Sequence, residues 1–310
     1  MELCFYNAVM TGMAANGRQF TYVNQLASTD SDLSKRAEWF TCACCPPNVT
    51  RLLGYIGGYL WTSQTGESES SVAVNVHMYT SATLSIPLGK QVVEIEQKSN
   101  WPWEGNIEFA IRNLGELSAT MKLRIPSWAT TWQVRIHLKY FWSVLTFSKI
   151  SPDLSDPQIC KGYVTLTPAW LKVNPEFQLN IPLPPRFISP HPYTNQDIIA
   201  LARGPLVYCV EDLDNSWVDD HFKSLVLDPA CPVSERSIST PEIGETYIGL
   251  TAHNAASRIA ATEDVAPHMP LGSTTQKKHP SIEQLHFIPY ALRDNRGGKG
   301  HMRVGIRRKR

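Results

Sequence analysis

Hydrophobic positions recur with a helical period in the first seventy residues of the chain. Leu3, Tyr6, Val9, Met10 and Met13 follow this spacing, and Gly17 is a suitable stop for the helix that they predict. A polar loop over residues 28–35 precedes a second helix, which we expect to begin at Pro46–Pro47. Its expected buried face carries apolar side chains at Val49, Leu52, Leu53, Ile56, Tyr59 and Leu60.

From Ser71 onward the hydrophobic period changes to two, which is typical of strands that bury one face. Turn signals at 89–90, 113–115 and 126–127 separate these short runs, which favours antiparallel sheets packed as a sandwich. The alternating positions are Val72, Val74 and Val76; Ile107, Phe109 and Ile111; Met121, Leu123 and Ile125; Trp132, Val134, Ile136 and Leu138; and Phe177, Leu179 and Ile181.

A proline cluster over residues 182–192 marks the boundary to a second β-rich block. Ile198–Val210 is its clearest expected strand, and the weakly patterned residues 230–285 are expected to form long loops. The predicted domains are therefore residues 1–70, 71–188 and 189–310. Two helices alone cannot bury their apolar faces, so the first segment needs further helices as partners.

Composition and charge argue against a nucleic-acid-binding, membrane-spanning or secreted protein. The 310 residues carry a net charge of +1, which predicts no general affinity for nucleic acid or for anionic membranes. No run of apolar residues reaches the length of a membrane span, and the N-terminus lacks the basic region of a signal peptide. Seven cysteines, four of them before residue 46, indicate reduced thiols and a cytoplasmic location rather than a disulfide framework.

The sequence CACCPPN places three cysteines in the four residues before two prolines. Cys45 stands at the N-cap position of the second helix, where the helix dipole favours thiolate over thiol. Cys44 and Cys45 are therefore candidates for a nucleophile or for metal ligands. Buried packing is the alternative, and it is the less probable explanation of three thiols so close together.

These residues also carry a resemblance to a known family. WFTCACCPPNVTRLLGYIGGYLW resembles the cysteine signature of glycoside hydrolase family 127, the β-L-arabinofuranosidase-like family. Further similar segments follow in the order of that family: ELCFYNAVMTGMAANGRQFTYVNQL, NWPWEGNIEFAI, LRIPSW, KGYVTL, LARGPLVYCVE and FIPYALRDNRGGKGHMRV.

The resemblance implies an α+β chain: the last helices of an (α/α) six-hairpin barrel, followed by two antiparallel β-sandwich domains. It also implies retaining hydrolysis of terminal β-L-arabinofuranosides by a zinc-bound cysteine. Cys44 matches the nucleophile and a zinc ligand, and Cys45 matches the next ligand. Glu2 and Tyr22 match positions that contact the sugar. A thiolate suits this reaction because it is both a good nucleophile and a good leaving group.

The departures from the family matter equally. The other zinc ligands and the acid/base glutamate precede the matched region in the family, and Met1 stands just before the matching Glu2. Residues 139–160 also depart from the family pattern. We therefore expect a fragment that lacks most of the catalytic barrel and is inactive as given.

Three hypotheses for function stay open at this point. The first is a glycosidase that uses Cys44, and the second is a non-catalytic remnant that binds carbohydrate or another protein. The third and weakest is a redox site or a structural zinc knuckle, which predicts metal binding without any dependence on sugar. A homodimer through the β domains is the corresponding hypothesis for assembly.

Overall fold

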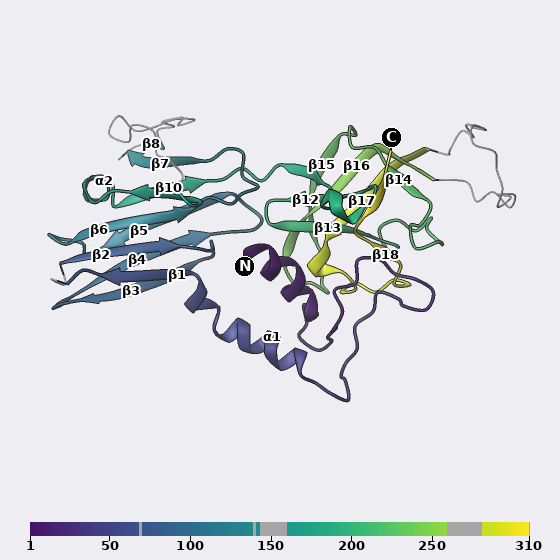
Figure 1. The fold of residues 1–310 in the computed structure, drawn as a ribbon, viewed down its shortest axis with the longest axis horizontal. Coiled ribbons are helices and arrows are strands. Elements are labelled where there is room, and N and C mark those ends of the chain that lie inside the picture. Colours follow the sequence, from purple (N-terminus) through teal and green to yellow (C-terminus); the bar gives the residue numbers. More distant parts are fainter. Residues whose placement is uncertain (68–69, 139–140, 143–159, 259–280, 310) are drawn as a thin grey trace, which may run out of the picture. The chain divides into compact units, whose positions relative to one another are not determined.

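The computed structural model describes residues 1–67, 70–138, 141–142, 160–258 and 281–309 (Figure 1). The divergent segment 139–160 therefore lies almost wholly outside the described residues. The chain divides into two compact units, one formed by residues 50–184 and the other by residues 1–49 together with 185–310. The three predicted domains, with boundaries at residues 70 and 188, stay a prediction.

The N-terminal helical segments are shorter than the hydrophobic pattern predicts. A π-helical turn spans Cys4–Val9 and a 3-10 turn spans Met10–Gly12, so this helical run ends before Gly17. Helix α1 (Cys45–Gly54) begins at the expected place and is followed by a 3-10 turn at Ile56–Tyr59. The expectation of helix up to residue 70 is wrong, because strand β1 (Trp61–Thr65) pairs with the next strand from Trp61 onward.

The expected buried face of α1 is also only partly correct. Leu60 is buried, but Val49, Leu52, Leu53 and Ile56 are half-buried and Tyr59 is exposed. The amphipathic pattern is present in the sequence, but the described residues cover only part of the face that it creates.

The unit formed by residues 50–184 contains two sheets. A four-stranded sheet has the order β1, β2 (Ser71–Val76), β6 (Ser118–Arg124) and β9 (Tyr163–Leu166). A six-stranded sheet has the order β3 (Ala82–Leu88), β4 (Gln91–Ser99), β5 (Asn106–Arg112), β10 (Glu176–Asn180), β7 (Gln133–Leu138) and β8 (Phe141–Trp142). Strands of both sheets run along a similar direction, and the short helix α2 (Pro168–Val173) precedes β10 (Figure 1).

Period-two hydrophobicity explains these strands. Val72, Val74 and Val76 are buried on β2 while their neighbours are half-exposed, and Ile107, Phe109 and Ile111 do the same on β5. The pairs in this unit are antiparallel except β2 with β6. The predicted turns hold as well, since Gly89 and Asn113 have the positive φ that tight turns require.

The other unit has one mixed sheet. Its order is β11 (Pro185–Ile188), β12 (Ile198–Arg203), β19 (Ile306–Arg308), β14 (Leu225–Leu227), β16 (Thr246–Arg258), β17 (Ser281–Pro289), β13 (Leu206–Glu211) and β18 (Met302–Arg303), with β15 (Val233–Ser239) paired to β16. The described chain is thus mostly β-structure with few helices.

Two sequence predictions for this unit are wrong. Residues 198–210 form two strands instead of one, because Gly204, with φ +52°, turns the chain between β12 and β13. Residues 230–285 are not only loops, since β15, β16 and the start of β17 lie there. β15 consists mostly of polar residues, so its sequence lacks the alternation of hydrophobic and polar positions that predicts a strand.

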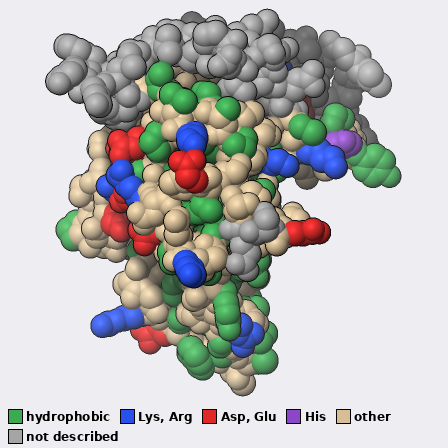
Figure 2. Space-filling model, turned by 90° about the vertical axis from the view of Figure 1, so that its left-hand side faces the viewer, with side chains coloured by type: hydrophobic (Ala, Val, Ile, Leu, Met, Phe, Trp, Pro, Cys, Tyr) green, Lys and Arg blue, Asp and Glu red, His purple; other side chains and the backbone are tan. Residues whose placement is uncertain are grey.

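Acidic and basic side chains lie next to one another on the face shown in Figure 2, in keeping with the near-zero net charge. Within the described parts of the chain, no helix is long and apolar enough to cross a membrane.

Candidate active site

The two adjacent thiols lie at the start of α1. Cys44 immediately precedes the helix and Cys45 is its first residue. Their Sγ atoms are 3.7 Å apart, so both sulfurs are directed to a common side. Cys44 is exposed and Cys45 half-buried, which makes packing alone a poor explanation for the pair. All seven cysteines are free thiols.

Tyr22 holds the backbone of the thiol turn. The Cys44 amide donates a hydrogen bond to the Tyr22 hydroxyl over 3.1 Å, and this hydroxyl donates to the carbonyl of Cys42. The Tyr22 ring stacks on Phe40 with a centroid distance of 4.2 Å. One hydroxyl therefore fixes both ends of the turn between Cys42 and Cys44.

The environment separates the pKa values of the two thiols. A hydrogen bond from the Cys45 thiol is the main cause that lowers the pKa of Cys44, and Tyr22 and Cys42 act in the same direction against desolvation. The same bond raises the pKa of Cys45, which would lose it on deprotonation. Desolvation and the neighbouring Cys44 raise the pKa of Tyr22, so its hydroxyl keeps its proton. Cys44 is therefore the thiol that ionises first.

The thiol pair suits two positions of a tetrahedral metal site. Zinc–sulfur bonds of about 2.3 Å at a tetrahedral angle place two sulfurs about 3.8 Å apart. The observed 3.7 Å between Cys44 Sγ and Cys45 Sγ matches that spacing. The described residues contain no group of three or more His, Cys, Asp or Glu side chains that could hold a metal. Two of the four ligands of a closed site are thus available here.

Glu2, the other predicted sugar contact, lies just before the π-helical turn, and its side chain is buried with 7% exposure. It belongs to the same compact unit as Tyr22 and the thiols. The contacts described above join Tyr22 to Cys42 and Cys44, and Cys44 to Cys45. A role of Glu2 or Tyr22 in sugar binding stays a prediction.

Sequence reasoning missed two buried arginines beside this site. Arg36 is 7% exposed and Arg293 is 1% exposed, and both donate hydrogen bonds to the N-terminal segment. Arg293 lies in the C-terminal segment that resembles the family. That resemblance was the only signal, because periodicity does not reveal a buried cation.

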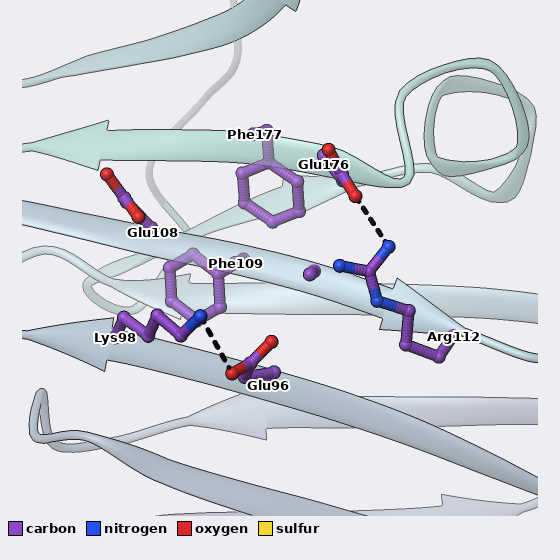
Figure 3. A pocket seen from close by; sticks show the side chains of 8 residues that line it. Glu96, Lys98, Glu108, Phe109, Arg112, Glu176 and Phe177 are labelled. Atoms are coloured by element: carbon purple, nitrogen blue, oxygen red, sulfur yellow. Dashed lines mark hydrogen bonds and ion pairs between the residues drawn. The ribbon is translucent and has the colours of Figure 1, made fainter.

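A separate hollow lies on the six-stranded sheet. Figure 3 shows its charged rim, with ion pairs from Lys98 to Glu96 (3.0 Å) and from Arg112 to Glu176 (2.5 Å). The rim charges neutralise one another, and the two phenylalanines beside them, Phe109 and Phe177, are buried in the core. The hollow therefore offers no exposed aromatic platform for a sugar.

Comparison with known proteins matches nearly the whole chain to one family. Residues 1–58 match the β-L-arabinofuranosidase family 127 catalytic domain, residues 73–179 match its middle domain, and residues 185–307 match the glycoside hydrolase family 127 C-terminal domain. The chain belongs to glycoside hydrolase family 127. This family membership confirms the resemblance carried by the cysteine signature.

Individual relatives agree with this assignment. A non-reducing end β-L-arabinofuranosidase of Bifidobacterium longum is 29% identical over 69% of this chain. The crystal structure of a family 127 β-L-arabinofuranosidase from Geobacillus stearothermophilus T6 covers the whole chain with 27% identity and a TM-score of 0.74. A second solved family 127 β-arabinofuranosidase, 24% identical with a TM-score of 0.74, supports the fold.

This family 127 chain spans only part of these relatives. It covers 32% of the Bifidobacterium enzyme and 46% of the Geobacillus structure.

Proposed function

We propose that this chain carries the thiol part of the active centre of a retaining β-L-arabinofuranosidase. The observation that supports it most is the pair of sulfurs 3.7 Å apart at the start of α1, in a chain of family 127. In this proposal the first segment forms the end of a helical catalytic barrel, and the β units pack as sandwiches.

Cys44 is the proposed nucleophile. Its thiolate attacks the anomeric carbon, the bond to the leaving oxygen breaks, and a pentosyl group is held on sulfur. Water then attacks the same carbon and gives its proton to the group that acted as general acid in the first step, the carbon–sulfur bond breaks, and the thiolate is regenerated. The two displacements retain the anomeric configuration.

The surrounding residues support that role. The Cys45 thiol and the Tyr22 hydroxyl favour the ionised form of Cys44. Cys44 and Cys45 would hold a zinc ion, which, when bound, keeps the sulfur deprotonated at neutral pH. Glu2 and Tyr22 are the proposed sugar contacts.

The general acid is the missing part. Protonation of the leaving oxygen contributes about 10²–10⁴-fold to such reactions, and no carboxylate of this chain matches the position of that acid in the family. We infer that the chain alone binds zinc weakly and turns over slowly. A cytoplasmic location and a homodimer through the β units remain part of this proposal.

Turnover of p-nitrophenyl β-L-arabinofuranoside tests the proposal. The chain is assayed alone and fused behind the part of the Bifidobacterium enzyme that precedes the matched region. We expect turnover and bound zinc only in the fusion, abolished by Cys44→Ser and unchanged by Cys160→Ser, a free exposed thiol in the other unit.

Two outcomes contradict the proposal. Turnover that survives Cys44→Ser would exclude Cys44 as the nucleophile. Arabinoside binding by the fusion without any turnover would favour the non-catalytic remnant.

A further inference from the structure

Two buried arginines connect the C-terminal segment, residues 287–304, to the N-terminal segment, residues 1–49, which carries Tyr22. Arg293 follows the 3-10 turn Tyr290–Leu292 and is almost fully buried, with 1% exposure. Arg36 lies beside it and is 7% exposed. Both belong to the compact unit that also holds the thiols. Buried cations need several hydrogen-bond partners, so their contacts show which segments they join.

Each arm of the Arg293 guanidinium contacts a different part of the N-terminal segment. Nε donates to Thr11 Oγ1 over 3.1 Å, Nη1 donates to Ser34 Oγ over 2.7 Å, and Nη2 donates to the Val23 carbonyl over 3.3 Å. The guanidinium carbon lies 5.6 Å from the centre of the Tyr290 ring. Thus one side chain joins three segments that are distant in sequence.

The backbone beyond Tyr22 is held at a second point. The Tyr290 hydroxyl donates to the Gln25 carbonyl over 2.9 Å, two residues past the Val23 carbonyl that Arg293 holds. The position of residues 23–25 is therefore set by the C-terminal segment.

Arg36 stabilises Arg293 in place. Its Nη1 donates to the carbonyl of Arg293, and its Nε and Nη2 donate to the carbonyl of Thr11 over 3.2 and 3.0 Å. The Arg36 amide donates to Asp294 Oδ2 over 2.6 Å. The two arginines thereby share Thr11 and keep the C-terminal segment against the N-terminal one.

Tyr22 links the backbone held by Arg293 to the turn that carries the thiols. It directly precedes Val23, and its hydroxyl accepts from the Cys44 amide while donating to Cys42. We propose that Arg293 is a positioning residue of the active centre, which acts through Val23 and Tyr22 to fix the turn that presents Cys44 and Cys45. The role of Arg293 in an active centre rests on the proposed glycosidase function. The hydrogen bonds that link Arg293 to the thiol turn do not depend on that function.

Arginine suits this position better than lysine. Its planar fork presents donors in fixed directions to Thr11, Ser34 and Val23 at once, whereas a lysine ammonium is a compact charge on a flexible chain. Arg293→Lys therefore keeps the positive charge and removes the simultaneous contacts.

Hydrogen exchange of the Cys44 amide tests this positioning directly. Pro46 and Pro47 have no amide hydrogen, so a peptide covering residues 41–48 has few exchanging positions and reports Cys44 clearly. We expect Arg293→Lys to raise exchange at Cys44 about tenfold, the effect of losing roughly one hydrogen bond of local stability.

Matched variants define the controls. Arg303→Lys should leave the Cys44 amide unchanged, because Arg303 is another arginine of the C-terminal segment, which donates to the His221 carbonyl over 2.9 Å. Adding Arg293→Lys to Tyr22→Phe should cause no further increase, because the hydroxyl that passes on the constraint is already absent. Additive increases in that double variant would overturn the proposed route.

A second variant covers the case in which Arg293→Lys does not fold. Ser34→Ala removes only the acceptor of Nη1 and should raise exchange at Cys44 in the same direction by a smaller factor. Unchanged exchange at Cys44 in a folded Arg293→Lys or Ser34→Ala protein would overturn the proposal.

Cobalt binding gives an independent readout of thiol placement. Co²⁺ coordinated by thiolates absorbs in the near ultraviolet, and loss of residues that orient metal ligands weakens metal affinity by about 10–100-fold. We expect a weakening of at least about tenfold in Arg293→Lys and none in Arg303→Lys. Absent cobalt binding in every variant would count against the proposed metal site, while the exchange measurement would still decide the role of Arg293.

Discussion

At the scale of single residues, Cys44 owes its acidity mainly to its neighbour in the sequence. When Cys44 ionises, the Cys45 thiol is the donor to its sulfur, so the two thiols titrate as an unequal pair. This asymmetry distinguishes a nucleophile from a second thiol, although the residues are adjacent and chemically identical.

We predict that Cys45→Ala raises the pKa of Cys44. Because the folded-state pKa of Cys44 is lowered by the Cys45 hydrogen bond, the variant should alkylate more slowly with iodoacetamide near neutral pH and equally fast well above both pKa values. The measurement is the rate of modification of the Cys44 peptide against pH, in the presence of a chelator. Cys160→Ala is the control, and an unchanged profile in Cys45→Ala would contradict the assigned hydrogen bond.

At the scale of structural elements, a buried ion cluster stabilises the end of β13. Arg296 pairs with Asp214 over 2.5 Å and with Glu211 over 3.1 Å, and Arg296 and Glu211 are each only 6% exposed at the side chain. Burial raises the pKa of Glu211 against the opposing hydrogen bond of the Asp294 amide and the charge of Arg296. Beside it, the amides of residues 299–301 donate to the Asp212 carboxylate.

Arg296→Gln should lower the free energy of unfolding by about 3 kcal/mol or more, because it leaves the buried Glu211 carboxylate without its cation and removes the nearer of the two arginines that pair with Asp214. The folded-state pKa of Glu211 is already raised and should rise further in the variant. The loss should therefore be largest at pH 8 and should shrink as the pH falls through that raised pKa, because protonation of Glu211 removes its buried charge. Urea unfolding of the variant and of the unaltered chain, at pH 8 and at pH 5, measures this loss of free energy.

Arg308→Gln is the matched control for this charge change. Arg308 is exposed on β19, so its replacement should change the free energy of unfolding by less than about 0.5 kcal/mol. A loss in Arg296→Gln no larger than in Arg308→Gln would contradict a stabilising role of the cluster.

The elements also show what sequence patterns can and cannot predict. Period-two hydrophobicity located β2, β5 and β6 because each buries alternate side chains. The same sequence pattern located β7 and β10, although β10 buries three consecutive side chains. It missed β15, whose exposed positions are serine and glutamate, and it merged β12 with β13 across Gly204. Local pattern does not encode which strands pair, and it cannot show that Arg293 reaches Val23 across 270 residues.

The candidate site likewise has one part that the local sequence predicts and one part that it does not. The Pro46–Pro47 pair predicts the helix start, and with it the placement of Cys44 and Cys45. The hydrogen bonds of Tyr22 depend on the loop between Phe20 and Cys42, whose course is set by isolated bridges rather than by any periodic pattern.

At the scale of the whole molecule, exposed large hydrophobic side chains concentrate before residue 60 of the described chain. Within residues 1–49, which belong to one compact unit, Leu26, Leu33 and Trp39 are 60%, 42% and 63% exposed. Exposed apolar surface of this kind marks a region that another part of a protein covers. The proposal that the first segment completes a helical barrel accounts for it.

We predict that the folded chain binds a hydrophobic dye through this region. Leu26→Gln combined with Leu33→Gln should reduce dye fluorescence, whereas Val173→Gln, an exposed apolar position in the other unit, should not. Fusion behind the preceding part of the Bifidobacterium relative should reduce the fluorescence most. A chain that binds no dye and unfolds cooperatively would contradict the predicted uncovered face.

The role of Cys44 as the nucleophile is tested by identifying the residue that carries the sugar during turnover. The fusion protein is mixed with p-nitrophenyl β-L-arabinofuranoside, quenched in acid within one turnover, digested, and analysed by mass spectrometry. We expect one pentosyl group on the peptide that contains Cys44, with fragmentation placing it on the Cys44 sulfur. A pentosyl group on any other residue, or its presence in the Cys44→Ser fusion, would exclude Cys44 as the nucleophile.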